Sequence, residues 1–273
     1  MRKLITAEQI RQEVEFDYLV FFGRFQIFHN GHLAVILKAL AKGKKVVIVV
    51  GSVFQAPSLR NPIPFDHIKH KILSCFSADL HGRIIIVPLM DSHSDDLWLV
   101  NAQAVVNQAI LEDGHQLPSR VGLIGHAKDH TSFYLNRFPQ WSSVRVENVD
   151  GISGTDIRNH LFRGDSQEEV RDYLLEDDFI RQRVPLTVLG ILKDVVMEPF
   201  FLSVLKESWE NEKRMAPYKD VPYKPTLFAV DTVVIQSGHV LMVERDGYPG
   251  KGLIALPGGF IREDEKALDG ALR

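Results

Sequence analysis

Apolar residues follow two different rhythms along the first half of the chain. Short runs rich in valine, isoleucine and phenylalanine predict strands, and segments with an apolar residue at every third or fourth position predict helices. We expect strands at residues 18–22, 45–50, 83–87, 120–124 and 143–146, and helices at residues 31–41, 66–76, 97–111, 132–138, 154–162 and 167–181. Because strands that alternate with helices are joined by right-handed crossovers, the pattern predicts an α/β domain with a parallel sheet covered on both faces. Ligands of such sheets bind at the carboxyl ends of the strands.

The second half of the chain has a different character. Residues 184–212 read as a strand followed by a long helix, and the segment MAPYKDVPYKP has the proline and tyrosine content of a linker. From residue 226 onward, the runs LFAVDTVVI and HVLMVER predict two antiparallel strands around a turn at residues 236–238. We therefore expect an α/β domain over residues 1–183, a connecting segment over 184–225 and the beginning of an α+β domain over 226–273.

The composition is that of an ordered protein without a large field of one charge. The 273 residues are 45% hydrophobic and 25% charged, which supplies a sizeable core. The formal net charge is -3, so neither nucleic acid nor an anionic membrane is the expected partner. The single cysteine, Cys75, is expected in the core. The amino-terminal residues are too charged for a signal peptide, and no run approaches the ~20 apolar residues of a membrane span, so we expect a cytoplasmic protein.

The segment DYLVFFGRFQIFHNGHLAVILKAL runs from a buried strand into a helix that begins near Gly31. His29 and His32 are three residues apart and fall on one side of the helix start, where unpaired N–H groups and the helix dipole favour an anion. Two imidazoles there are suited to bind the α-phosphate of a nucleotide, and Gly31 lets the backbone approach it. The alternative is that both histidines merely cap the helix or line the core.

A second helix start has a similar composition. In ISGTDIR, Ser153 and Thr155 stand at the predicted start and Arg158 lies one turn inside the helix. Hydroxyl and N–H groups at this end suit the β- and γ-phosphates of ATP, and a guanidinium clamps phosphate oxygens with a fork of donors. Taken alone, this pattern is also a common helix cap.

The loop after the second predicted strand carries residues suited to bind the phosphate group of a second substrate, which would accept a group from the nucleotide. Ser52 follows the strand, and the loop continues as FQAPSLRNPIPFDH with Arg60 and Asn61. An arginine in a loop at the end of a strand is well placed to bind phosphate. A solvated surface arginine is the alternative for Arg60.

Three motifs together resemble those of a known family. GRFQIFHNGH resembles the GRFQPxHxGH signature of nucleotidyltransferases of the nicotinamide mononucleotide adenylyltransferase branch, with Ile27 where that family usually has proline. ISGTDIR resembles the family's ISxTxIR motif, and GHAKDHTSFYLNRFPQW resembles GHxKDxSSYYLxxFPQW. The resemblance covers residues 16–182 and implies a Rossmann-like domain that joins nicotinamide mononucleotide to the adenylyl group of ATP, giving NAD and pyrophosphate.

The resemblance also assigns roles to individual residues. The catalytic residues it implies are His29, His32, Arg24 and Arg158. The ATP-binding residues it implies are Gly23, Phe25, Gly31, Gly125, His126, Lys128, Asp129, Ser153 and Thr155. The residues expected at nicotinamide mononucleotide are Ser52, Arg60, Asn61, Asp91 and Trp98. An indole stacks well on a cationic pyridinium ring, although Trp98 could instead be a core tryptophan.

The segment ALPGGFIREDEKALDGALR resembles the first part of a Nudix box, the Mg²⁺-dependent motif of hydrolases that cleave nucleoside diphosphate derivatives. The matching residues are Gly258, Gly259, Glu265 and Arg273. In this order, after an adenylyltransferase domain, the arrangement resembles bifunctional proteins that also hydrolyse ADP-ribose. Because the sequence stops before the glutamate-rich half of the box, we expect Glu265 to pair with Arg273 more than to bind metal, and residues 226–273 to be inactive by themselves.

Two other functions stay open at this point. An adenylyltransferase or cytidylyltransferase for another phosphorylated acceptor would use the same histidines, although Trp98 favours the nicotinamide substrate. A nucleotide-sensing regulator of NAD metabolism would explain an incomplete hydrolase, but the phosphate-binding groups are complete and no basic helix-turn-helix pattern is present. The sequence leaves open whether the chain forms a homo-oligomer.

Overall fold

The computed structural model describes residues 4–115, 119–125, 137–146, 152–223 and 225–273. The chain divides into two compact units, Met1–Leu202 and Ser203–Arg273. The division falls inside helix α9 (Pro199–Met215), so the first unit extends past residue 183.

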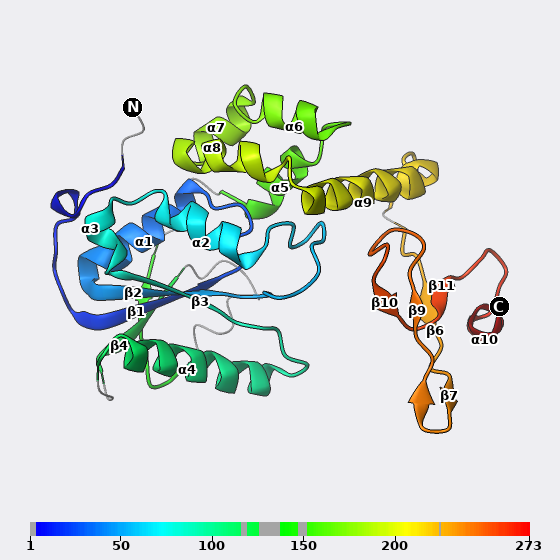
Figure 1. Ribbon diagram of the computed structural model, residues 1–273, viewed down its shortest axis with the longest axis horizontal. Helices are drawn as coiled ribbons and strands as arrows, with labels where there is room; N and C mark the ends of the chain where they lie inside the picture. Colours follow the sequence, from blue (N-terminus) through cyan, green and yellow to red (C-terminus); the bar gives the residue numbers. More distant parts are fainter. Residues whose placement is uncertain (1–3, 116–118, 126–136, 147–151, 224) are drawn as a thin grey trace. The chain divides into compact units, whose positions relative to one another are not determined.

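The first unit contains a five-stranded parallel sheet (Figure 1). Its strands, in spatial order, are β3 (Ile84–Pro88), β2 (Gly43–Val50), β1 (Phe16–Gly23), β4 (Val121–Gly125) and β5 (Ser142–Arg145). Every neighbouring pair is parallel, and each strand lies within two residues of a predicted one. The predicted fold class is thereby confirmed. The strand order reverses between β1 and β4, which is where sheets of this type leave a crevice at the carboxyl ends of their strands.

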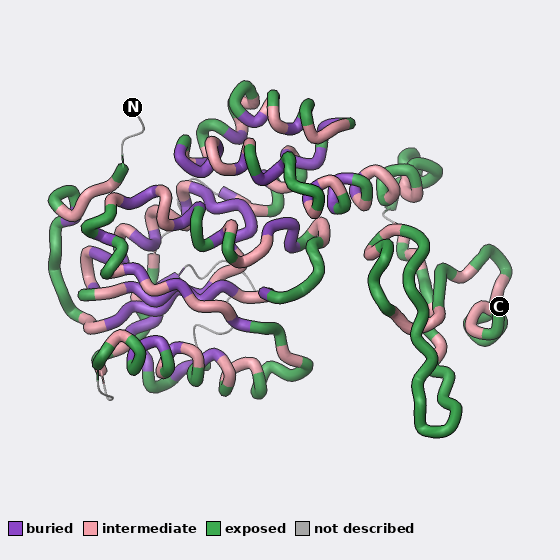
Figure 2. The backbone as a smooth tube through the Cα atoms, in the orientation of Figure 1, coloured by how far each residue is buried: buried purple, intermediate pink, exposed green. Residues whose placement is uncertain are grey.

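Helices cover both faces of this sheet. Figure 1 shows α1 (Asn30–Lys42), α2 (Phe65–Leu73) and α3 (Ala78–His81) on one face and α4 (Asp95–Glu112) on the other. Figure 2 shows the strands between them as largely buried. Side chains of β1 alternate between the two layers. The cluster packed against α4 comprises Tyr18, Val20, Phe22, Val47, Val49, Leu89, Ala102, Val106, Ala109, Ile110, Leu123, Phe138 and Trp141. Burial on both faces is why the strands read as continuous apolar runs.

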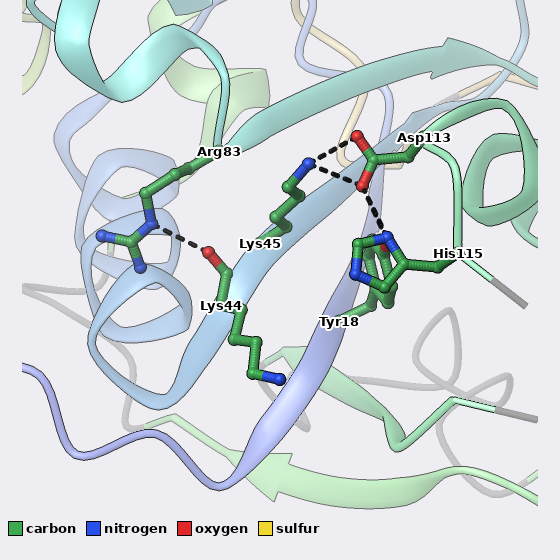
Figure 3. Close-up of polar contacts among 6 residues, drawn as sticks. All are labelled: Tyr18, Lys44, Lys45, Arg83, Asp113 and His115. Carbon is green, nitrogen blue, oxygen red and sulfur yellow. Dashed lines mark hydrogen bonds and ion pairs between the residues drawn. The ribbon is translucent and has the colours of Figure 1, made fainter.

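A polar cluster holds the end of α4 against the amino-terminal ends of the strands (Figure 3). The Asp113 carboxylate accepts a hydrogen bond from the Tyr18 hydroxyl at 2.6 Å and pairs with Lys45 Nζ at 2.5 Å. His115 Nδ1 lies 3.5 Å from the same carboxylate. Burial, reinforced by Asp113, raises the pKa of Tyr18, so its hydroxyl remains a donor at neutral pH. This cluster is structural and lies at the sheet edge away from the carboxyl ends of the strands.

Among the described residues, the sheet is followed by α5 (Gly154–Leu161), α6 (Gln167–Tyr173), α7 (Asp178–Arg183) and α8 (Leu186–Val195), before α9 begins. The single helix predicted at residues 167–181 is therefore wrong, because the Asp177 side chain accepts a hydrogen bond from the Ile180 N–H and starts a new helix. The strand predicted at the start of 184–212 is also wrong. Its place is taken by α8, whose apolar residues are buried with helical spacing behind Pro185. The helix predicted at 132–138 lies largely outside the described residues.

The second unit contains short antiparallel strand pairs after α9. Its elements are β6 (Ala229–Asp231), β7 (Ile235–Gln236), β8 (His239–Val240), β9 (Val243–Glu244), β10 (Ile254–Ala255), β11 (Gly258–Phe260) and α10 (Ala267–Leu272). The predicted hairpin is present as β7 and β8, and Ser237 and Gly238 both have positive φ, as a type I′ turn requires. No described residue from 225 to 273 is buried, in contrast to the first unit. No helix in the described part of the chain is long and apolar enough to cross a membrane.

Candidate active site

The opening of helix α1 holds the two predicted histidines in one arrangement. His29 is the residue before the helix, and its Nδ1 accepts the His32 backbone N–H at 3.4 Å. The His29 backbone N–H in turn donates to His32 Nδ1, also at 3.4 Å, and the two rings stack with centroids 3.7 Å apart. Because both Nδ1 atoms accept, each neutral ring carries its proton on Nε2. The pair therefore presents two Nε2–H donors suited to an anion.

Neighbouring residues of GRFQIFHNGH keep these rings in place. His32 lies edge-on to the Phe25 ring at 4.9 Å and is stacked on Phe28 at 5.7 Å, and both phenylalanines are buried. A Cβ on Gly31 would lie 3.1 Å from the His29 ring, and a Cβ on Gly23 would lie 2.8 Å from the Phe25 ring. The two glycines are thus needed because their neighbours' rings occupy the space of a side chain.

The opening of α5 lies against the opening of α1. A Cβ on Gly154 would be 3.6 Å from His29 Nε2 and 3.9 Å from Arg158 Nη1. Arg158 Nη2 also donates to Thr155 Oγ1 at 3.1 Å, which orients the guanidinium within its own helix. Ser153 is the residue before α5, and its hydroxyl makes no capping hydrogen bond to the helix. The imidazole of His29 and the guanidinium of Arg158, which are far apart in the sequence, thus lie at two adjacent helix N-termini.

Three arginines from separate segments act on one another in this region. Burial, followed by the charges of Arg24 and Arg60, lowers the pKa of Arg158 to about 10. Burial and then the charge of Arg60 also lower the pKa of Arg24, and the carboxylate of Asp91 opposes this shift. With a pKa of about 10, Arg158 remains cationic at neutral pH. A bound anion relieves the repulsion between the half-buried Arg24 and Arg158 and the exposed Arg60, so this arrangement suits phosphate groups.

The loop after β2 forms a hydrogen-bonded connection between Arg24 and Asp91. Arg24 Nη1 donates to Asn61 Oδ1 at 3.5 Å, and Asn61 Nδ2 donates to Gln55 Oε1 at 3.4 Å. Gln55 Nε2 donates to Asp91 Oδ2 at 2.8 Å, and Ser52 Oγ donates to Asp91 Oδ1 at 3.1 Å. Sequence reasoning singled out these residues except Gln55. Its position in a loop at the carboxyl end of a strand is a signal that could have included it.

The remaining predicted residues of the first unit are Trp98 and Gly125, which the structure describes, and three residues that follow β4. Trp98 is half-buried and packs on Phe22 at 5.6 Å and on Phe138 at 6.5 Å between ring centroids, so at least part of its indole belongs to the α4 core. Gly125 ends β4 and is buried. His126, Lys128 and Asp129 lie outside the described residues.

In the second unit, Glu265 is bound by its own chain. Arg273 Nε donates to Oε1 at 2.9 Å, Arg273 Nη2 donates to Oε2 at 3.2 Å, and the Arg262 backbone N–H donates to Oε2 at 2.9 Å. Arg273 in particular lowers the pKa of Glu265 to about 2. Among the described residues, no group of three or more histidine, cysteine or acidic side chains is arranged to hold a metal ion. The described residues around Glu265, Gly258 and Gly259 therefore do not fit a metal.

Comparisons with known proteins agree with this geometry. Residues 20–160 match the cytidylyltransferase-like family. A nicotinamide/nicotinic acid mononucleotide adenylyltransferase of Acinetobacter baylyi is 40% identical over 151 residues, which cover 55% of this chain and 78% of the relative. A nicotinamide-nucleotide adenylyltransferase of Sulfurisphaera tokodaii is 41% identical over 87 residues, covering 31% of this chain and 50% of the relative.

Solved structures extend the similarity to most of the chain. A bifunctional NMN adenylyltransferase/ADP ribose pyrophosphatase from Francisella tularensis has 29% identity and a TM-score of 0.76, and the match covers 94% of this chain and 72% of that one. The same protein complexed with AMP and a manganese ion matches with 28% identity and a TM-score of 0.74, again covering 94% of this chain and 72% of that one. The sheet, the paired helix openings and these similarities lead to one conclusion: the chain belongs to the cytidylyltransferase-like family of nucleotidyltransferases and is a homologue of the nicotinamide mononucleotide adenylyltransferases.

Proposed function

We propose that this chain joins nicotinamide mononucleotide to the adenylyl group of ATP, forming NAD and releasing pyrophosphate. The observation that carries the proposal is that the amino-terminal ends of α1 and α5 lie together. His29 is therefore close to Arg158, and Arg158 interacts electrostatically with Arg24 and Arg60. The adenylyltransferase activities of the relatives from Acinetobacter baylyi and Francisella tularensis support the same reaction.

The reaction needs charge stabilisation and positioning but no nucleophilic side chain. An oxygen of the acceptor phosphate attacks the α-phosphorus of ATP, and the bond from that phosphorus to the bridging oxygen breaks. Pyrophosphate leaves with the electron pair, so no proton has to move. His29 and His32 donate from Nε2 to the α-phosphate, and Arg158 neutralises the leaving pyrophosphate. Because these groups are already oriented, they cost little reorganisation when charge develops.

We assign the acceptor's phosphate to Arg24, Arg60 and the buried Asn61. Arg24 and Arg60 are close enough to repel each other, which favours a shared anion. Ser52, Asp91 and Trp98 are assigned to the nicotinamide side, and Gly125, His126, Lys128, Asp129, Ser153 and Thr155 to ATP. ATP enters such a reaction as its Mg²⁺ complex, so the metal belongs to the substrate.

We also propose that residues 226–273 begin a Nudix domain whose substrate class is ADP-ribose, with residues 1–183 as the transferase domain and 184–225 as the connection. The Francisella tularensis protein, which is bifunctional, supports this organisation because its match covers 94% of this chain. The Glu265–Arg273 pair would then fix the turn of the Nudix motif. Both enzymatic substrates are soluble nucleotides, in keeping with a cytoplasmic location.

Pyrophosphate release with MgATP and a panel of acceptors tests the proposed function. We expect release with nicotinamide mononucleotide, and we expect His32→Ala to lower kcat at least about 100-fold because one preorganised donor is lost. His239→Ala, which changes an exposed histidine of the second unit, is the matched control and should retain normal kcat. A near-normal rate for His32→Ala would contradict the mechanism.

The same panel separates the two alternatives. Release with flavin mononucleotide or pantetheine 4′-phosphate but not with nicotinamide mononucleotide would identify another acceptor. Binding of nucleotides without release of pyrophosphate from any acceptor would favour a nucleotide-sensing regulator.

A further inference from the structure

The loop between β2 and α2, residues 51–64, is bound by the carboxylate of Asp91. Ser52 Oγ donates to Asp91 Oδ1 at 3.1 Å, and Gln55 Nε2 donates to Asp91 Oδ2 at 2.8 Å. Asp91 follows β3, which is hydrogen-bonded to β2, so the carboxylate holds the loop from the neighbouring strand. One carboxylate oxygen of Asp91 accepts from Ser52, before Val53 and Phe54, and the other accepts from Gln55, after them.

Two residues of this loop have backbone conformations that are unfavourable for residues with a side chain. Ser52 has a φ of 55° and Phe54 a φ of 59°, both in the left-handed region where a Cβ meets the neighbouring carbonyl. Phe54 is nevertheless 71% exposed, and its ring lies tilted to that of Phe65 with 6.4 Å between the centroids. Burial of the Phe54 ring therefore does not explain the strain. The two hydrogen bonds to Asp91, together with the one from the Val53 N–H to the Leu89 carbonyl at 3.5 Å, hold the loop in this conformation.

Hydrogen bonds connect this loop to Arg24, one of the three arginines of the candidate site. Gln55 Oε1 accepts from Asn61, and Asn61 Oδ1 accepts from Arg24. Every hydrogen bond in the series points from the cation Arg24 towards the anion Asp91, which fixes the orientation of both amides. The conformation of the loop that carries Phe54 is thus coupled to the groups assigned to the acceptor's phosphate.

We propose that Asp91, Ser52 and Gln55 are positioning residues that hold Phe54 as a stacking surface for the flat ring of the acceptor mononucleotide. This inference rests on the proposed function. The face of a phenyl ring carries negative charge density, so it attracts a cationic pyridinium ring. Residues in strained backbone conformations cluster at active sites and at segments that clamp ligands. From its place on the nicotinamide side of the site, Asp91 then positions Phe54, and the Phe54 ring contacts the substrate.

Calorimetric binding to the full chain, saturated with an ATP analogue that cannot transfer its adenylyl group, tests the stacking. Phe54→Ala should raise the Kd of nicotinamide mononucleotide about tenfold, the loss expected for one ring contact with a cation. The Kd of ribose 5-phosphate, which has no ring to stack, should change less than about twofold. Phe54→Tyr should restore tight binding. Phe228→Ala removes another strongly exposed phenylalanine, in the second unit, and should leave both Kd values unchanged.

Unchanged nicotinamide mononucleotide binding by Phe54→Ala would overturn the proposal, as would an equal loss for ribose 5-phosphate. The positioning role is tested by a double-mutant cycle. Gln55→Ala should weaken nicotinamide mononucleotide binding more in the wild-type background than when Phe54→Ala is already present, where only its effect through Asn61 remains. Fully additive losses would refute action through Phe54. Faster hydrogen exchange of residues 52–55 in Gln55→Ala is expected as well, and this readout does not depend on activity.

Turnover distinguishes this proposal from the proposed function. A chain that forms NAD but whose Phe54→Ala variant binds nicotinamide mononucleotide normally keeps the proposed function and loses the stacking role. A chain that shows the expected binding pattern without releasing pyrophosphate keeps the stacking role and loses the transferase function. A wild-type chain that binds no nicotinamide mononucleotide loses both.

Discussion

Lys71 is a buried cation whose removal should reshape the pH dependence of stability. It lies on α2 with no exposed surface, and its Nζ donates to the backbone carbonyl of Gln26 at 3.1 Å. The Gln26 side chain in turn accepts the Ile63 N–H at 2.8 Å, so Lys71 helps to fix the segment that leads into the histidine pair. Burial lowers the pKa of Lys71 from its ordinary 10.5 to about 7.

The sign and size of the effect follow from proton binding. Below pH 7 the lysine is charged in the folded and the unfolded chain, and the full cost of burying the charge is present. Between pH 7 and 10.5 the unfolded chain binds more protons than the folded chain, so stability rises with pH. Integrating this difference from pH 7 to pH 9.5 gives about 3 kcal/mol from Lys71 alone. Lys71→Met removes the titrating group and should remove this rise.

Urea unfolding at a series of pH values measures the effect. Both chains should carry Trp209→Phe, because the fluorescence of Trp98 and Trp141 then reports on the first unit alone. From pH 7 to 9.5, the unfolding free energy of the Lys71-containing chain should increase by about 3 kcal/mol more than that of Lys71→Met. Parallel pH profiles for the two chains would refute the reasoning, since they would mean that the pKa of Lys71 is the same in the folded and the unfolded chain.

Two further substitutions separate catalysis from stability. Gly31→Ala places a Cβ 3.1 Å from the His29 ring, so kcat should fall about tenfold or more through displacement of the imidazole, while the helix propensity of alanine keeps the thermal midpoint close to that of the unchanged chain. An unchanged kcat would show that the His29 ring tolerates the shift. Tyr18→Phe removes the 2.6 Å hydrogen bond to Asp113 at the opposite edge of the sheet and should cost about 2 kcal/mol in urea unfolding with kcat unchanged. A loss of activity there would mean that the cluster affects the candidate site.

The parallel sheet was predictable because its strands have a local signature. A strand buried on both faces needs apolar residues at almost every position, and the runs in β1 and β2 are long enough to be recognised from the sequence. The error at α8 has the same origin. Val188 and Leu189 form a short apolar run beside Thr187, and the helical spacing becomes clear only when Leu192 and Val195 are included.

The histidine pair and Arg158 could be predicted as anion-binding candidates from sequence because helix starts create anion sites from local geometry. Their approach to each other could not be derived from local pattern, since it depends on how α5 lies against α1. The role of Gln55 was missed for the same reason, because its partners Asp91 and Asn61 come from other parts of the chain.

Local chemistry along the chain thus determined the five strands of the parallel sheet and most of its helices, and it indicated two helix starts suited to phosphate. Tertiary structure alone decided that Lys71 is buried, that three arginines share one region and that Phe54 stays exposed on a strained loop. The physical reason is that burial, charge repulsion and backbone strain depend on neighbours in space. Those neighbours are brought together only when the sheet and its helices pack.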